Sequence, residues 1–146
     1  MNLYIGIDLG TSAAKLLLMD ELGQIKNVVS KEYPLEFPRP GWSQQNPEDW
    51  RRAVMEGIPE LLEGFDGNTV VGIGCGGQMH GLVVLDDHDN VIRPAILWND
   101  GRTAAQVDYL NNEIGKEKLS ELTANIAFAG FTAPKILWIK ENEPEN

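Results

Sequence analysis

The 146-residue sequence is poor in several features that would each define a class of protein. It has one cysteine, Cys75, so no intrachain disulfide can form and a reducing cytoplasm is expected. No apolar run reaches the roughly 18 residues of a membrane-spanning helix, so no transmembrane helix is expected, and the first residues lack the basic end and cleavage site expected of a signal peptide. The acidity of the chain argues against an anionic membrane as a partner. Lys and Arg number 12 against 22 acidic residues, and the resulting net charge of −10 argues against nucleic acid as a partner.

A Walker phosphate loop is also missing, because no G-x-x-x-x-G-K-[ST] pattern occurs. Residues 4–15 instead read YIGIDLGTSAAK, two apolar runs joined by the polar turn Gly10–Ser12, which predicts a β-hairpin. Successive N–H groups of such a turn can form an anion site, and Asp8 beside it can hold an Mg²⁺ ion that arrives with a phosphate. A plain hairpin, with Asp8 bonded to its own turn, explains the pattern about equally well.

The rest of the chain predicts one mixed α/β domain that opens with an antiparallel meander. A helical crossover permits a parallel pairing between the first strand and the strand after the first helix. The predicted strands are 3–9, 14–20, 24–33, a buried strand 70–75, and 82–86 and 91–97. The predicted helices are 47–64, 102–114, 116–122 and a last helix capped by Thr132 and still running at Asn142.

Two short patterns suggest ligand sites that their surroundings do not support. Residues 72–77, GIGCGG, contain G-x-G-x-x-G, but a dinucleotide site needs a helix directly afterwards, and apolar strand-like residues follow. A nicotinamide oxidoreductase is therefore disfavoured. The acidic run Asp87–Asn90 lacks the glycine and the distal glutamate of a calcium loop, so we interpret it as a solvated turn.

Polar residues gather at three predicted strand ends, in the segments 8–15, 78–80 and 98–102. Ligands of open α/β sheets bind outside the carboxyl ends of strands, so all three segments are expected to face one cleft. His80 alone is more often a hydrogen-bonded structural histidine, and Met79 alone a core residue. Their position between Gly76-Gly77 and Gly81, after a predicted buried strand, favours a pocket lining instead.

Several motifs of the chain together carry a family resemblance. Gly6-x-Asp8-x-Gly10-Thr11 with Lys15 resembles the first phosphate motif of the sugar-kinase, Hsp70 and actin superfamily. Three longer segments, 40–50, 95–103 and 130–142, are similar to sequences of the FGGY carbohydrate kinases, and the last fits that family's first signature throughout. Gln78-Met79-His80-Gly81 resembles the family members that phosphorylate D-xylulose, whereas the glycerol-specific members carry Arg-Glu in place of Met79-His80.

The resemblance implies a ribonuclease H-like domain of the actin/Hsp70/sugar-kinase superfamily, incomplete in this chain. Residues 1–146 would be the N-terminal portion of the first kinase domain. The remainder of that domain, the second domain, the catalytic base and the adenosine pocket would lie beyond Asn146. The fragment alone is expected to be inactive, and apolar faces left uncovered, such as the helix over residues 134–140, would favour homo-oligomers.

The implied reaction is transfer of the γ-phosphate of ATP to D-xylulose, giving D-xylulose 5-phosphate, with ATP and Mg²⁺ as cofactors. Asp8 would position Mg²⁺ in support of catalysis. The residues implied to bind phosphate are Gly10, Thr11, Ser12 and Lys15. The residues implied to bind sugar are Met79, His80, Gln78 and, less directly, Trp98 and Asp100.

Two alternatives stay open. One is another FGGY kinase, acting on gluconate, ribulose or fuculose, which differs in the sugar it accepts. The other is a non-catalytic nucleotide-binding module of the actin or Hsp70 type, which would share the hairpin at residues 4–15 but has no need of Gln78–Gly81 or of the 130–142 signature.

Overall fold

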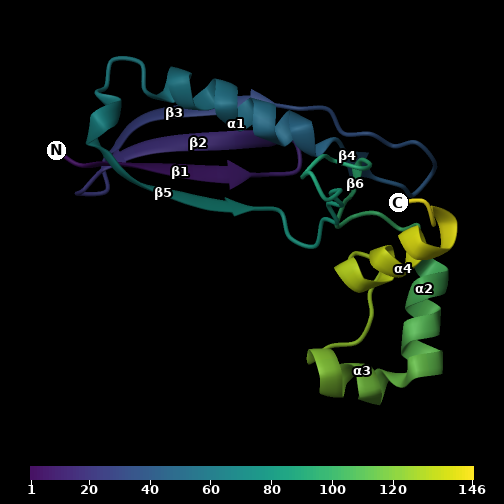
Figure 1. Ribbon diagram of the computed structural model, residues 1–146. Coiled ribbons are helices and arrows are strands. Elements are labelled where there is room, and N and C mark those ends of the chain that lie inside the picture. Colours follow the sequence, from purple (N-terminus) through teal and green to yellow (C-terminus); the bar gives the residue numbers. More distant parts are fainter. The chain divides into compact units, whose positions relative to one another are not determined.

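A computed structural model describes all 146 residues, which form two compact units (Figure 1). The first unit comprises residues 1–35 and 47–78, and the second comprises residues 36–46 and 79–146. The chain therefore passes from one unit to the other three times. None of the helices is both long and apolar enough to cross a bilayer.

A four-stranded mixed sheet forms the first unit, in the order β3-β2-β1-β5. The strands are β1 (Leu3–Leu9), β2 (Ala13–Asp20), β3 (Ile25–Glu32) and β5 (Val70–Gly77). The first three make the predicted antiparallel meander, and β5 pairs parallel to β1. A crossover through helix α1 (Pro47–Leu61) makes this parallel pairing possible. The predicted topology of this unit is confirmed.

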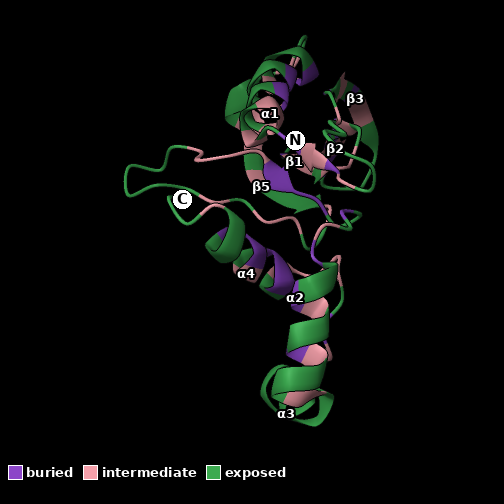
Figure 2. Ribbon diagram, turned by 90° about the vertical axis from the view of Figure 1, so that its right-hand side faces the viewer, coloured by how far each residue is buried: buried purple, intermediate pink, exposed green.

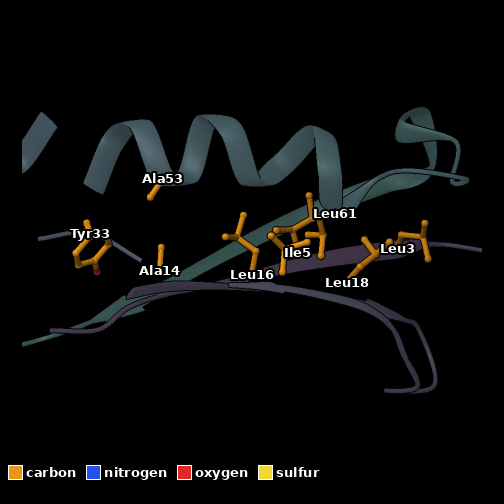
Figure 3. Packing of buried hydrophobic residues seen from close by; sticks show 9 residues of the cluster. Leu3, Ile5, Ala14, Leu16, Leu18, Tyr33, Ala53 and Leu61 are labelled. Carbon is orange, nitrogen blue, oxygen red and sulfur yellow. The ribbon is translucent and has the colours of Figure 1, made fainter. Parts of the chain in front are cut away.

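The core of the first unit lies between α1 and one face of the sheet (Figure 3). Alternate residues of β1 and β2 point toward the helix, as the period of two in a strand requires. Leu16 comes so close to Gly57 of α1 that a Cβ at position 57 would lie 2.8 Å from its Cδ1. The buried cluster comprises Leu3, Ile5, Ala14, Leu16, Leu18, Val29, Tyr33, Ala53 and Leu61.

The prediction that residues 70–75 form a buried strand is wrong. Strand β5 lies at the edge of the sheet, and Val71 and Ile73 are 55% and 63% exposed. Ile73 pairs with Ile5, so it lies on the face that carries the core, yet it is not among the residues that α1 covers. An apolar run therefore predicted burial that no element of this unit provides.

The second unit holds a two-stranded sheet and three helices. Strand β4 (Gln44–Gln45) pairs antiparallel with β6 (Ala95–Ile96), and residues 44–45 are not among the strands that the sequence predicted. The helices are α2 (Ala104–Tyr109), which continues as a π-helical stretch Leu110–Gly115, α3 (Lys116–Thr123) and α4 (Thr132–Asn142). Helix α3 has no buried residue, whereas one side of α4 is buried (Figure 2).

Residues 82–86 and 91–97 do not form the two predicted strands. They make isolated bridges, Leu82 with Ile96 and Leu85 with Val91, and only β6 within 91–97 is a strand. The register changes between these bridges, because Leu85 lies three positions after Leu82 whereas Ile96 lies five positions after Val91. Pro94 falls in this interval and has no N–H to donate, which interrupts the ladder.

Two predicted helix ends also differ from the structure. Helix α1 ends at Leu61, three residues before Gly64, which adopts a left-handed φ of 80°. Thr132 is the first residue of α4 rather than its cap, and Phe131 precedes the helix without a side-chain capping bond.

Candidate functional site

The predicted phosphate turn joins β1 to β2 in the first unit and is held by bonds to its backbone. The Gly10 N–H donates to the Ala13 carbonyl at 3.0 Å, and the Tyr33 hydroxyl donates to the Gly10 carbonyl at 2.5 Å. The Tyr33 N–H donates to the Ser12 carbonyl at 3.2 Å. Both ends of the turn are therefore fixed, and the Gly10 N–H is used inside the turn, so the binding of an anion by the turn stays a prediction.

Tyr33, which follows β3 and bonds to this turn, is a residue that the sequence reasoning missed. Its side chain belongs to the buried cluster beneath α1, and burial raises the pKa of its hydroxyl to about 12, with a further contribution from the negative charge of Asp8. The hydroxyl therefore stays protonated and donates to Gly10 at neutral pH. Tyr33 lies at the predicted end of the third strand, and its sequence neighbours gave no indication of this contact.

Asp8 and Lys15 pair across the β1–β2 ladder, so both side chains lie on the sheet face opposite α1. Both are exposed. The neighbour of Asp8 on β5 is Gly76, and a Cβ built there would meet nothing within 4 Å. An exposed carboxylate over open, glycine-lined backbone, next to a turn of N–H donors, fits an Mg²⁺ ion shared with a phosphate.

Gln78 connects this turn to the end of β5. Its N–H donates to the Leu9 carbonyl at 2.8 Å, and the Thr11 hydroxyl lies 3.3 Å from its side-chain oxygen. The prediction that residues 78 and 8–15 lie together is therefore confirmed within the first unit. Met79, His80, Trp98 and Asp100 belong to the second unit, so a cleft shared with the phosphate turn stays a prediction.

His80 lies in the loop that follows β5, with its backbone in the left-handed region at φ 61°. Its ring stacks on Phe131 with centroids 4.4 Å apart, and it lines a cavity of about 320 Å³ together with residues of α3 and α4. Met79 is 59% exposed, so it is not the core residue that its side chain alone would suggest. Both side chains are therefore available to a ligand.

The carbonyl of His80 accepts a hydrogen bond from Lys135 of α4 at 2.6 Å. The Lys135 side chain is completely buried, and burial lowers the pKa of its ammonium group to about 8. The sequence reasoning missed this lysine, although one signal was present. Lys135 shares the buried face of α4 with Trp138 and Ile139, at helical spacings of three and four residues.

Asp100 is buried rather than open to solvent. Its carboxylate accepts hydrogen bonds from the Ser43 N–H at 2.6 Å and from the Arg102 guanidinium at 2.8 and 2.9 Å. Arg102 in turn lies 3.9 Å from the ring centroid of Trp42 and 5.0 Å from that of Trp138. This buried ion pair joins the residues before β4 to the strand end after β6. Trp98, by contrast, is 44% exposed.

Two other features do not fit a sugar-phosphate site. A cavity of about 690 Å³ next to α4 is lined mainly by aliphatic residues such as Leu82, Val83 and Ile136, which offer nothing to a polyol. The cluster Asp86, Asp87 and His88 is a turn, as predicted, since the Asp86 carboxylate accepts bonds from the N–H groups of His88 and Asn90.

The sequence matches the model of the "FGGY family of carbohydrate kinases, N-terminal domain" over residues 3–146. The chain belongs to the FGGY family of carbohydrate kinases. The xylulose kinase of Lactococcus lactis is 47% identical over 99% of the chain. The chain spans 29% of that relative's length.

Solved structures support the same family and the actin/Hsp70-like fold. The xylulose kinase of Rhodospirillum rubrum superposes with a TM-score of 0.92 at 29% identity, covering 99% of this chain and 30% of its own. The gluconate kinase of Lactobacillus acidophilus superposes with a TM-score of 0.91 at 30% identity, covering 99% and 29%. Solved structures that resemble this chain therefore include enzymes named for different sugars.

Proposed function

We propose that residues 1–146 are the N-terminal portion of an ATP-dependent kinase that phosphorylates D-xylulose to D-xylulose 5-phosphate. The rest of the first domain and a second domain would complete the enzyme. The observation that carries the proposal is the loop Gln78–Gly81, in which Met79 and His80 are exposed after a strand that ends beside the phosphate turn. The 47% identity to a xylulose kinase supports the same substrate.

Within this chain, the turn Gly10–Ser12 would bind the γ-phosphate through N–H and hydroxyl donors, and Lys15 would neutralise part of its charge. Asp8 would hold Mg²⁺, which, when bound, neutralises charge on the phosphate oxygens. The 5-hydroxyl oxygen of the sugar attacks the γ-phosphorus, the bond to the bridging β–γ oxygen breaks, and ADP leaves. The hydroxyl proton passes to a carboxylate beyond residue 146.

The sugar would be recognised by His80 and Met79, with Trp98 at the rim. The imidazole can donate from one nitrogen and accept at the other, which suits adjacent hydroxyls, and the Met79 thioether offers an apolar wall. Asp100 acts on the sugar indirectly in this proposal, because Ser43 and Arg102 already occupy its oxygens. Phosphorylation of gluconate is the second candidate, favoured by the gluconate kinase among the structural neighbours.

The test is turnover by a complete kinase. The protein to be expressed is the product of the full reading frame that carries residues 1–146. If that frame stops at residue 146, the protein is a chimera in which residues 1–146 replace the matching segment of the L. lactis enzyme. ADP release is measured with D-xylulose, gluconate, ribulose and fuculose, and kcat/KM should be highest for D-xylulose. A higher value for gluconate would establish the second candidate instead, and no turnover of any sugar would overturn the kinase proposal.

His80→Ala in the same kinase tests the assignment of the sugar site. Losing a hydrogen bond to a bound hydroxyl costs about 1–3 kcal/mol, so KM for D-xylulose should rise roughly tenfold or more. Affinity for ATP without sugar should stay within about twofold, because phosphate binding is assigned to Gly10–Ser12. An ordinary structural histidine would instead lower the melting temperature and leave both KM values unchanged.

A further inference from the structure

Lys135 is a buried cation to which the proposed phosphoryl transfer assigns no role. Its side chain is inaccessible to solvent, and its Nζ donates to two backbone carbonyls, that of His80 at 2.6 Å and that of Gly130 at 2.7 Å. No carboxylate lies within ion-pair distance of it. Burying an ammonium group is costly unless its donors are used, and here they fix the positions of two loops.

One of these loops contains His80, the residue proposed to bind the sugar, in a strained backbone conformation. His80 has a φ of 61°, a region that side chains with a Cβ adopt at an energetic cost. Such a conformation persists only where surrounding contacts determine it, and it occurs preferentially at ligand sites. Two contacts determine it here, the Lys135 bond to the His80 carbonyl and the stacking of Phe131 on the imidazole.

The second loop gives Lys135 a fixed position from which to act. The Ala129 carbonyl accepts a bond from the Thr103 hydroxyl at 3.1 Å. A Cβ at Gly130 would lie 2.4 Å from the Trp98 carbonyl oxygen, so the backbone passes directly against the strand end after β6. Residues 129–131 are therefore held against the segment 98–103. From this fixed loop and the helix that follows it, Phe131 and Lys135 contact His80.

We propose that Lys135 is a positioning residue for sugar recognition: its ammonium group holds the His80 backbone in the left-handed conformation that presents the imidazole to the sugar. This inference rests on the proposed function, in which His80 contacts the sugar. Lys135 itself does not touch the sugar or ATP in this role, because it is enclosed. It connects the family's 130–142 signature to the Gln78–Gly81 loop.

The experiment compares Lys135→Met with Lys140→Met in the complete kinase. Both substitutions remove an ammonium group from α4, but Lys140 is exposed, whereas Lys135 is buried and donates to the His80 carbonyl. Lys135→Met should raise KM for D-xylulose roughly tenfold or more while KM for ATP stays within about twofold, since misplacement of a binding group weakens only its own ligand. Lys140→Met should leave both constants within about twofold of the unsubstituted enzyme.

A double-mutant cycle separates positioning from a general loss of structure. If Lys135 acts through the His80 side chain, then Lys135→Met should add little to His80→Ala, and the combined rise in sugar KM should be well below the product of the two single effects. Lys135→Gln, which retains one donor group, should give an intermediate KM and serves where the Met variant fails to fold.

The outcomes distinguish the inference from the proposed function. An unsubstituted enzyme that turns over no sugar would overturn the proposed function. An active enzyme whose sugar KM is unchanged in Lys135→Met or Lys135→Gln would overturn only the positioning role. Single effects that multiply fully, or a parallel rise in both KM values with a lower melting temperature, would make Lys135 a structural residue.

Discussion

Asp100→Asn should destabilise the second unit far more than an ordinary change of one charge. The Asp100 and Arg102 side chains are both completely buried, and their closest atoms are 2.8 Å apart. Replacement of one carboxylate oxygen by an NH₂ group places donors against donors and leaves the guanidinium without its counter-charge. Arg102 cannot turn to water, because Trp42 and Trp138 pack against it.

The magnitude follows from burial. Removing one partner of a buried ion pair costs about 3–5 kcal/mol, because the remaining charge stays desolvated. The Ser43 N–H, which donates to an Asp100 oxygen, would face either the NH₂ group of Asn, which cannot accept, or its uncharged amide oxygen, which is a weaker acceptor. A loss of this size is a large part of the roughly 5–15 kcal/mol that stabilises a typical domain.

The assay is urea unfolding of the 146-residue chain, followed by tryptophan fluorescence, which Trp42 and Trp138 make sensitive to this region. Glu121→Gln is the matched control, because it breaks a Lys118–Glu121 pair whose side chains are 54% and 68% exposed. That change should cost no more than about 0.5 kcal/mol. In the double variant Asp100→Asn/Arg102→Met, part of the loss should be recovered because no unpaired charge remains buried.

A cost below about 1 kcal/mol for Asp100→Asn would refute the reasoning from burial, since it would match an exposed pair. If the same variant in the complete kinase kept its stability and lost sugar affinity, Asp100 would be a direct sugar ligand. Both measurements on one variant therefore decide between the two roles.

Four further outcomes are expected. Tyr33→Phe should weaken the phosphate turn by about 1–3 kcal/mol through the lost bond to Gly10, seen as a lower melting temperature; a melting temperature equal to that of the unsubstituted chain would contradict it. Because the pKa of Tyr33 is raised to about 12, its contribution is complete below pH 10 and is lost as the pH rises toward 12; stability measured over this range should fall less steeply in Tyr33→Phe. Asp8→Ala in the complete kinase should lower kcat far more than it raises sugar KM, and a normal kcat would exclude the role in phosphate positioning. The 146-residue chain alone should turn over no D-xylulose, and any measured turnover would contradict the expectation that groups essential for activity lie beyond Asn146.

Local patterns were sufficient to predict the strand topology of the first unit. The apolar alternation of residues 3–33 and the short turns between them predicted the meander, and the intervening helix predicted the parallel pairing of β5 with β1. These features depend on neighbouring residues and on the hand of the crossover, both of which a sequence carries. The burial of β5 was predicted wrongly because burial depends on what covers a strand, which its own residues do not specify.

The candidate site was predictable only where its members are close in the sequence. Residues 8–15 and the loop 78–80 were found from local motifs. The Tyr33 hydroxyl and the Lys135 ammonium group reach their carbonyl partners across 23 and 55 residues, and a backbone carbonyl leaves no trace in a residue pattern. Asp100 was a candidate because it lies in the polar segment 98–102. Its pairing with Ser43 and Arg102 became visible only in the folded structure.

The division of the chain into units that each take two segments has a consequence for protein engineering. Residues 36–46 supply β4 to the second unit, although they lie between the meander and α1 of the first. A cut after Gln78 therefore releases no intact unit. The C-terminal product contains β6 without its partner β4, and the N-terminal product contains β4 without β6. Independent expression of either unit requires splicing its two segments with a new linker, and a protease that nicks one loop between the units cannot separate them.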